Sequence, residues 1–229
     1  MLREGAVQWR CRDTVPPMPF EPSEFHGGLE RREMLQFVPS SARSILDVGC
    51  SHGRFGSVLK AHNPTWELTG IEPDPMAAQA AADHYDTVIQ GLYPENMPAD
   101  QRFDCIIFND VLEHVVDPWT MLRQSKDHLD DSGTIVASIP NVRYVIVVRN
   151  LLLRGRWDYT DWGVLDRTHL RFFTRASIED LFASSGFVIQ SLTPINPVTV
   201  RWGRLLLGTF RDMRFQQFAV TAKLASTAG

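Results

Sequence analysis

The sequence predicts an α/β fold in which a mostly parallel sheet is covered by helices on both faces. Three observations support this prediction: short β-rich segments alternate with helical patterns, prolines stand near the helix starts, and a glycine-rich turn follows the first expected strand. Ligands of such sheets bind at the carboxyl ends of the strands, so functional residues are expected where the strands end.

The elements follow from local composition. The expected strands are short and rich in apolar residues, and they are 44–49, 66–72, 87–91, 103–109, 133–140, 187–192 and 215–224. The expected helices have helical spacing of apolar residues, and they are 53–63, 75–85, 117–130 and 177–187. Pro75 and Pro118 stand near helix starts. In the last helix, Ser177 can cap the first turn and Gly186 can end the helix.

The chain of 229 residues is long enough for one sizeable domain with insertions. The main domain is expected over 26–224, after a proline-rich arm over 1–25 and before a frayed tail over 225–229. The regular alternation breaks at 141–175 and again at 197–214. These two inserts are expected to cover the acceptor side of the site.

Charge is unevenly distributed along the chain. The formal net charge is −4, but residues 1–140 carry 11 basic and 21 acidic side chains, whereas residues 141–229 carry 12 and 6. This division suits either two solvated faces of opposite sign or a cation-binding half beside an anion-binding half. Lysine is scarce and no nucleic-acid motif occurs, so no nucleic-acid partner is expected.

Three widely spaced cysteines form neither a disulfide framework nor a zinc pattern, and no metal is expected. The sequence has no apolar run long enough to span a bilayer, and its first residues lack the apolar core of a secretion signal. A protein of the reducing cytoplasm is therefore expected.

The segment "ILDVGCSHGRFG", residues 45–56, places three glycines between a strand and a helix, where a ligand can approach backbone N–H groups. It lacks the Gly-Lys-Ser/Thr of a phosphate loop and the glycine spacing of a dinucleotide loop. Asp47 at the strand tip would repel a pyrophosphate and suits a cationic ligand. Glu72, at the end of the next strand, can accept both hydroxyls of a ribose. Together they describe S-adenosylmethionine.

Four segments in register resemble the class I S-adenosylmethionine-dependent methyltransferases: "ILDVGCSHGRFG", "GIEPDP", "FDCIIFNDVLEHVVDP" and "ASIPNV". The downstream "GRWDYTDWGVLDRTHLRFFTRASIEDLFASSGF" resembles a bacterial branch that includes many enzymes found with glycan and natural-product pathways. The resemblance covers roughly residues 26–224. It implies a Rossmann-like, doubly wound sheet of seven strands in the order 3-2-1-4-5-7-6, the last strand antiparallel, with a lid insert.

The resemblance also implies cofactor contacts. Asp47, Gly49 and Gly53 match the first motif, which lines the methionine end and the ribose, and Cys50 and Ser51 lie in the same loop. Ser51 replaces the family's middle glycine.

The remaining implied contacts come from the later motifs. Glu72 matches the ribose clamp, and Pro73 is expected beside the adenine. Leu92 stands where many relatives have an aspartate that accepts a hydrogen bond from the adenine amine. Asn109 and Asp110 match the loop beneath the sulfonium.

Methyl transfer to a hydroxyl needs a base, and histidine suits that role near neutral pH. His114 follows the cofactor loop, and His169 lies in the insert, where Asp166 could orient its ring. The alternatives are that His114 packs against or caps the next helix and that His169 locks the lid through a structural hydrogen bond. His52, in the glycine loop, is interpreted as a spacer.

The insert also carries candidate acceptor contacts. Trp157 and Tyr159 can stack on a sugar or planar ring, and Arg167 and Arg171 can hold an anionic acceptor. Alternatively, the aromatic side chains pack the lid and the arginines pair with acidic residues of the same segment. The apolar run "YVIVVRNLLL" is expected to be buried in the cap, with an interfacial contact or a dimer face left open.

The expected activity is methyl transfer from S-adenosylmethionine to a small-molecule or glycan hydroxyl, with an amine as the second choice of acceptor. The acceptor is expected to be anionic or sugar-like, and a homodimer stays open. Two other classes remain: a nicotinamide-dependent oxidoreductase, which shares the strand–glycine–helix unit, and a non-catalytic partner subunit that binds S-adenosylmethionine.

Overall fold

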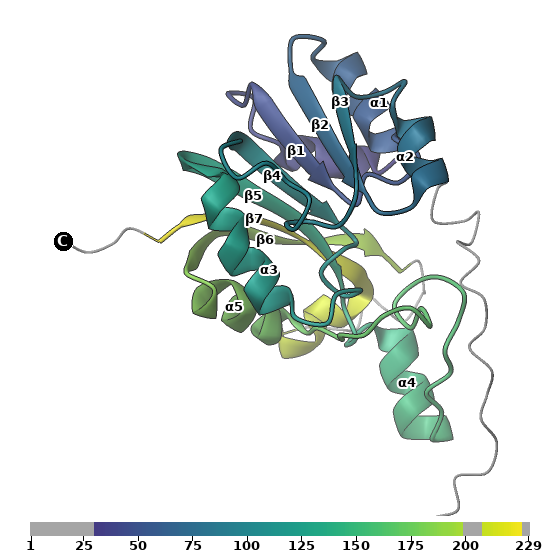
Figure 1. The fold of residues 1–229 in the computed structure, drawn as a ribbon. Helices are drawn as coiled ribbons and strands as arrows, with labels where there is room; N and C mark the ends of the chain where they lie inside the picture. Colours follow the sequence, from purple (N-terminus) through teal and green to yellow (C-terminus); the bar gives the residue numbers. More distant parts are fainter. Residues whose placement is uncertain (1–29, 199–207, 226–229) are drawn as a thin grey trace, which may run out of the picture.

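The computed structural model describes residues 30–198 and 208–225. The expected arm over 1–25, the centre of the second insert and the end of the tail lie outside the described residues. The described chain forms a central sheet with helices on both sides (Figure 1).

The sheet has seven strands in the order β3-β2-β1-β4-β5-β7-β6, as the sequence predicted. Their bounds are β1 Ser44–Val48, β2 Glu67–Glu72, β3 Thr87–Gln90, β4 Phe103–Asn109, β5 Leu129–Pro140, β6 Phe187–Pro197 and β7 Phe215–Leu224. The pairs from β3 to β5 are parallel, and β7 runs antiparallel to both β5 and β6. β5 begins before the predicted residue 133 and is irregular near its start.

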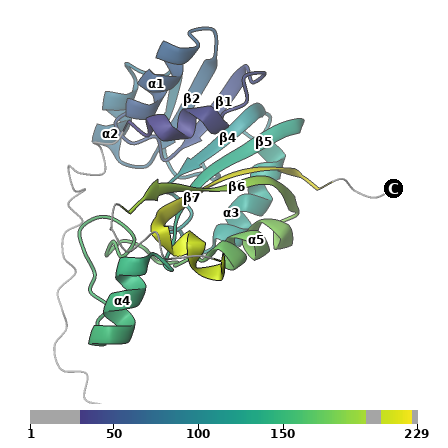
Figure 2. The same cartoon turned by 180° about the vertical axis from the view of Figure 1, so that it is seen from behind.

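Two hydrophobic cores fill the two faces of the sheet, because side chains alternate along a strand. In β1, Leu46 and Val48 belong to the core under α3 (Pro118–Ser125) and α5 (Arg175–Ser184). Ile45 belongs to the opposite core, with α1 (Arg54–His62) and the 3₁₀ helix η2 (Arg32–Phe37). Figure 2 shows α1 and α2 (Pro75–Ala81) on the side away from α3 and α5.

Helix starts follow capping chemistry. Asp74 caps α2 and Asp117 caps α3, and each accepts a hydrogen bond from a backbone N–H of the first turn, with proline following the cap. The prediction for α5 was wrong in one respect: Thr174 is the N-cap, and Ser177 is the third helical residue of the capping box. Gly186 follows the helix with a φ of +82°, as expected of a terminating glycine.

The apolar run of the first insert forms α4 (Val145–Arg154), which extends away from the sheet (Figures 1 and 2). Val145 and Val147 are buried, but Leu152 and Leu153 are 74% and 78% exposed. The expected burial of the run therefore holds only for its first turn, because the second half of the helix lies beyond the sheet and its covering helices. Within residues 30–198 and 208–225, no helix has the length and hydrophobicity needed to cross a bilayer.

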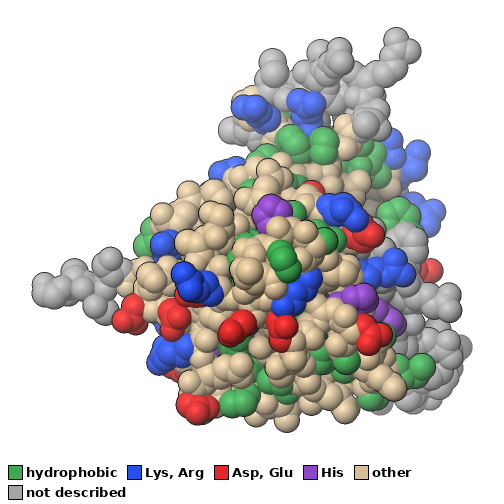
Figure 3. All heavy atoms as spheres, turned by 90° about the horizontal axis from the view of Figure 1, so that it is seen from above, with side chains coloured by type: hydrophobic (Ala, Val, Ile, Leu, Met, Phe, Trp, Pro, Cys, Tyr) green, Lys and Arg blue, Asp and Glu red, His purple; other side chains and the backbone are tan. Residues whose placement is uncertain are grey.

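The charge asymmetry of the sequence does not produce a face of one sign on the view of Figure 3. Basic and acidic side chains both occur on that face, with histidine among them. The interpretation as two separately charged surfaces is not supported there.

Candidate functional site: a cavity at the ends of β1 and β4

A cavity of about 240 Å³ lies at the carboxyl ends of β1 and β4, between the glycine loop and the segment 162–169. Ten of the residues that the sequence singled out line it: Asp47, Gly49, Cys50, Ser51, His52, Asn109, Asp110, His114, Asp166 and His169. The cavity is therefore at the edge of the sheet where the α/β pattern predicts a ligand site.

The glycine loop turns through left-handed backbone conformations at Gly49, Ser51 and Gly53, whose φ angles are +69°, +48° and +79°. A Cβ at Gly53 would lie 2.8 Å from the backbone of Ala81, so a side chain has no room there. Gly53 caps α1 without lining the cavity. Ser51 adopts its positive φ with a side chain, at a cost of about 1–2 kcal/mol.

Glu72 joins this loop to the next strand. Its Oε2 accepts a hydrogen bond from Ser51 N–H at 2.9 Å, and its Oε1 accepts one from Asp74 N–H at 3.0 Å. Both oxygens keep further acceptor capacity, which two ribose hydroxyls can use. Glu72, Pro73 and Leu92 do not line the cavity itself; Glu72 lies behind Ser51, which does, and the Leu92 side chain is 60% exposed.

Asp47 is buried in the cavity floor, where Tyr85 Oη–H donates to its Oδ2 at 2.5 Å. Burial raises the pKa of the Asp47 carboxyl to about 7, the Tyr85 hydrogen bond opposes this rise, and the charge of Glu72 adds to it. A cation beside Asp47 would lower this pKa again. The position is therefore suited to an ammonium.

The loop after β4 places two polar side chains in the cavity wall. The amide oxygen and nitrogen of Asn109 are buried without a hydrogen-bond partner among the described residues. Asp110 accepts from Gln217 Nε2 at 2.7 Å and from Ser138 Oγ at 3.0 Å, and it lies 3.3 Å from Arg31. Sequence reasoning missed Arg31, which is buried, lines the cavity and has no distinguishing motif around it.

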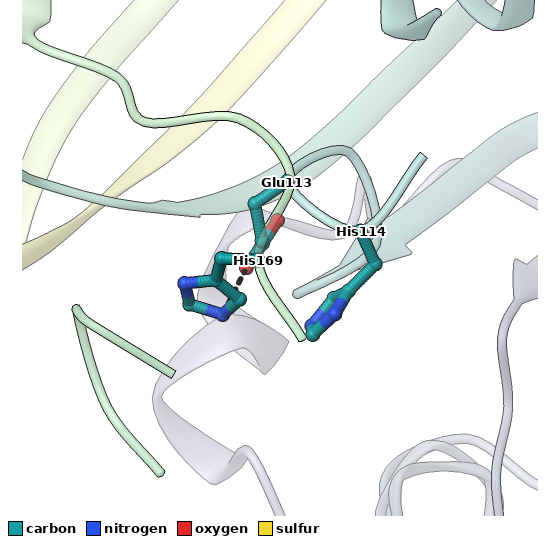
Figure 4. Close-up of side chains that lie close together, drawn as sticks. All are labelled: Glu113, His114 and His169. Carbon is teal, nitrogen blue, oxygen red and sulfur yellow. Dashed lines mark ion pairs between the residues drawn. The ribbon is translucent and has the colours of Figure 1, made fainter. Parts of the chain in front are cut away.

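Two histidines meet at the other wall of the cavity. The ring centroids of His114 and His169 are 4.7 Å apart, with the rings nearly perpendicular (Figure 4). His169 Nδ1 lies 3.1 Å from the Val164 carbonyl, which can only accept, so in the neutral ring the proton is on Nδ1 and Nε2 carries the lone pair.

Thr168 orients the second ring. Its Oγ1–H donates to Asp166 Oδ1 at 2.7 Å, so it accepts from His114 Nδ1–H at 3.1 Å. The neutral His114 ring therefore carries its proton on Nδ1. Asp166, which the sequence expected to orient His169, is linked by these bonds through Thr168 to His114. Thr168 was missed because only the fold brings it to His114.

Glu113 holds the two segments together and adds a buried carboxyl. Its carbonyl accepts from Leu170 N–H at 2.8 Å and Arg171 N–H at 3.0 Å. Its carboxyl is fully buried, has no hydrogen-bond partner among the described residues, and lies 4.0 Å from His169 Nε2 (Figure 4). Burial, with repulsion from Asp110, raises the pKa of Glu113 well above its ordinary range.

The ligand atoms of Glu113, His114 and His169 lie within 4.8 Å of one another. One carboxylate and two imidazoles form a donor set that could hold a divalent transition metal. The sequence expected no metal, because these residues have no metal-ligand spacing along the chain.

The predicted acceptor contacts lie outside the cavity lining. Arg167 pairs with Asp161 at 2.6 Å, and Arg171 Nε donates to the Val116 carbonyl at 3.1 Å. Trp157 and Tyr159 pack around Phe172, with ring centroids 5.3 and 6.4 Å away. Trp162 is the aromatic residue of this segment that lines the cavity.

Comparison with known proteins identifies the family. Residues 26–192 match the family described as methyltransferase domain. The chain is 26% identical over 183 residues to the ubiquinone biosynthesis O-methyltransferase of Azorhizobium caulinodans, covering 72% of this chain and 67% of that one. It is 27% identical over 142 residues to the enzyme of the same name from Coxiella burnetii, covering 56% and 60%.

Solved structures share the fold. A methyltransferase of Thermotoga maritima, described as a possible histamine N-methyltransferase, has a TM-score of 0.59 at 18% identity, covering 87% of this chain and 89% of that one. The plantazolicin methyltransferase, solved with SAH, has a TM-score of 0.59 at 16% identity, covering 85% and 80%.

The fold and the site define a Rossmann-like methyltransferase, and the chain belongs to the methyltransferase-domain family. It is an S-adenosylmethionine-dependent methyltransferase, as the sequence predicted. The nicotinamide-dependent alternative is set aside.

Proposed function

We propose that the protein transfers the methyl group of S-adenosylmethionine to a hydroxyl of a small-molecule or glycan acceptor, and that a histidine of the cavity takes the hydroxyl proton. The observation that carries the proposal is the pair His114 and His169: both rings line the cavity beside the cofactor loop, their centroids are 4.7 Å apart, and the Nδ1 of each lies at a hydrogen-bond acceptor, so the neutral rings carry their basic lone pairs on Nε2.

The described residues fit the cofactor. Asp47 suits its ammonium, the Glu72 carboxylate suits its ribose, and the unpartnered amide of Asn109 is available at the end of β4. Arg31, whose Nε has no hydrogen-bond partner in the described chain, can meet the methionine carboxylate. S-adenosylmethionine supplies an activated methyl group, so the chain needs only to align the acceptor, exclude water and accept a proton.

The histidines suit an oxygen acceptor better than a nitrogen acceptor. A neutral amine attacks without prior deprotonation, whereas a hydroxyl needs a base. An imidazolium at His169 would lower the raised pKa of Glu113, which lies 4.0 Å from its Nε2, and the Glu113 carboxylate would in turn stabilise that imidazolium. The O-methyltransferase names of the relatives support the same choice.

The acceptor is proposed to enter beside Trp162, with its ring or sugar toward the aromatic side chains of the insert. Arg167 and Arg171 remain proposed contacts for an anionic group, and each would first have to leave its present partner. Trp157 and Tyr159 would form the outer part of the same surface.

The test is incubation of the protein with isotope-labelled S-adenosylmethionine and fractionated cell extract, followed by mass spectrometry and NMR of labelled products. An O-methyl product supports the proposal, and an N-methyl product overturns the choice of acceptor. With the acceptor known, we expect His169→Asn or His114→Asn to lower kcat by about 10²–10⁴-fold. A loss of less than about tenfold for both variants would exclude a histidine base.

A matched measurement separates a base from a metal ligand. The wild-type rate is measured after treatment with a chelator and again after Mg²⁺ or Zn²⁺ is added back. A rate that chelation abolishes and a metal restores would show that the Glu113–His114–His169 cluster acts through a metal, and the histidine-base mechanism would then be wrong.

A further inference from the structure

Tyr85 is a buried residue behind the cavity wall, and its hydroxyl donates to the Oδ2 of Asp47. It lies after α2 and before β3, far in sequence from the glycine loop. This bond fixes the orientation of the Asp47 carboxyl and leaves acceptor capacity on the carboxyl for a ligand in the cavity.

A glycine of α1, Gly56, makes room for this tyrosine, and Gly70 makes room for its neighbour Cys50. A Cβ at Gly56 would lie 2.5 Å from Tyr85 Cζ, and a Cβ at Gly70 would lie 2.6 Å from Cys50 Sγ and 3.4 Å from the Tyr85 ring. Gly56 is inside α1 and has no positive φ, so backbone conformation does not require a glycine there. The space taken by the Tyr85 ring does require it.

We propose that Tyr85 is a positioning residue for the cofactor: its hydroxyl orients Asp47 and favours the anionic form that meets the ammonium of S-adenosylmethionine. The inference rests on the proposed function, because it assumes that the ammonium binds at Asp47. Tyr85 itself does not line the cavity, so its effect on binding passes through Asp47.

The surroundings explain why such a donor is needed. Glu72 at the end of β2 repels the Asp47 charge, and the thiols of Cys50 and Cys105 stay protonated because burial raises their pKa values. The other titratable or charged groups of the cavity are Arg31, His52, Arg54, Asp110, Glu113, His114, Asp166 and His169. Tyr85 lies behind these groups, and its hydroxyl donates a hydrogen bond to Asp47. This hydrogen bond lowers the Asp47 pKa.

The test is Tyr85→Phe, with calorimetric titration of S-adenosylhomocysteine across the neutral pH range. Loss of a hydrogen bond to a charged group is expected to raise the Asp47 pKa by about 1.5 units. From a starting pKa of about 7, we expect about tenfold weaker binding near pH 7.5, narrowing to about twofold near pH 8.5. A purely structural defect would not depend on pH in this way.

Two controls make the outcome decisive. 5′-Methylthioadenosine lacks the ammonium, so Tyr85→Phe is expected to leave its affinity unchanged at every pH, which also shows that the variant is folded. Tyr93→Phe removes another buried hydroxyl, which contacts His128 away from the cavity, and should leave both ligands unaffected.

Each result points to one conclusion. Wild-type affinity and wild-type pH dependence in Tyr85→Phe would overturn the positioning role, and so would an equal loss for both ligands. If wild-type protein bound neither ligand, the proposed function itself would fail. If it bound both equally well at all pH values, the ammonium would not be recognised at Asp47, and the inference alone would fail.

Discussion

Replacing Asp47 by Asn should make the ligand-free protein more stable at alkaline pH. The Asp47 pKa rises from 3.8 to about 7 in the folded chain because the carboxyl is buried. Between these values the folded state holds a proton that the unfolded state has lost, so stability falls as pH rises from about 4 to about 7. At about 1.4 kcal/mol per unit, the penalty above pH 7 is on the order of 4 kcal/mol, an upper value that Asn would remove.

The assay is thermal unfolding of the ligand-free protein near pH 5.5 and near pH 8. For a chain of this length, 1 kcal/mol corresponds to about 2–4 °C in Tm. We expect Asp47→Asn to gain several degrees over wild type near pH 8 and about half as much near pH 5.5, because by pH 5.5 about half of the penalty has developed. Glu113, whose pKa is also raised, adds a slope of the same sign in both proteins. Asp86 has a lowered pKa, so its contribution is lost only at more acidic pH.

Asp158→Asn is the matched control, because Asp158 is exposed and its carboxylate pairs with the exposed Arg156. It should follow the wild-type profile at both pH values. The more stable Asp47→Asn protein should bind S-adenosylhomocysteine more weakly, since the carboxylate that destabilises the fold is the one proposed to hold the ammonium. If Asp47→Asn has the same pH slope as wild type, the carboxyl does not titrate near neutrality and the reasoning fails.

Three further substitutions test other parts of the structure. Gly56→Ala should gain about 1 kcal/mol of stability from helix propensity but lose about 1–3 kcal/mol to the clash with Tyr85, so urea unfolding should show a less stable protein. A more stable variant with wild-type cofactor affinity would contradict the packing of Tyr85 against Gly56. Glu72→Gln sets an amide N–H₂ against a backbone N–H, which should weaken binding of S-adenosylhomocysteine by about tenfold to a hundredfold and that of 5′-methylthioadenosine equally, since both carry the ribose. The titrations are made near pH 8.5, where Asp47 is ionised with or without the Glu72 charge, and unequal losses there would refute the ribose role. Leu152→Ser, on the exposed side of α4, should change the free energy of unfolding by less than about 0.5 kcal/mol. A larger loss of stability in urea unfolding would show that this side chain is covered.

The strands were predictable because each carries a local signal. Segments such as 103–109 are mostly apolar, with a central run over 105–108, and burial on both faces of a parallel sheet favours that pattern. The strand order came from the resemblance, and the structure confirms it. Helix boundaries were less certain: the capping role belonged to Thr174 and not to Ser177, because both hydroxyls fit the local pattern and only the backbone path separates them.

The sequence alone predicted where the cofactor end of the site should lie, since Asp47 and Glu72 stand at the ends of neighbouring strands, and the carboxyl ends of parallel strands must meet at one edge of the sheet. Only the tertiary structure decided which other side chains gather around the cavity. Tyr85 beneath Asp47, Thr168 between Asp166 and His114, and the buried carboxyl of Glu113 beside His169 join segments that are far apart along the chain. No local periodicity records such contacts, because they arise from packing of a loop against the sheet and depend on space, burial and the few polar partners within reach.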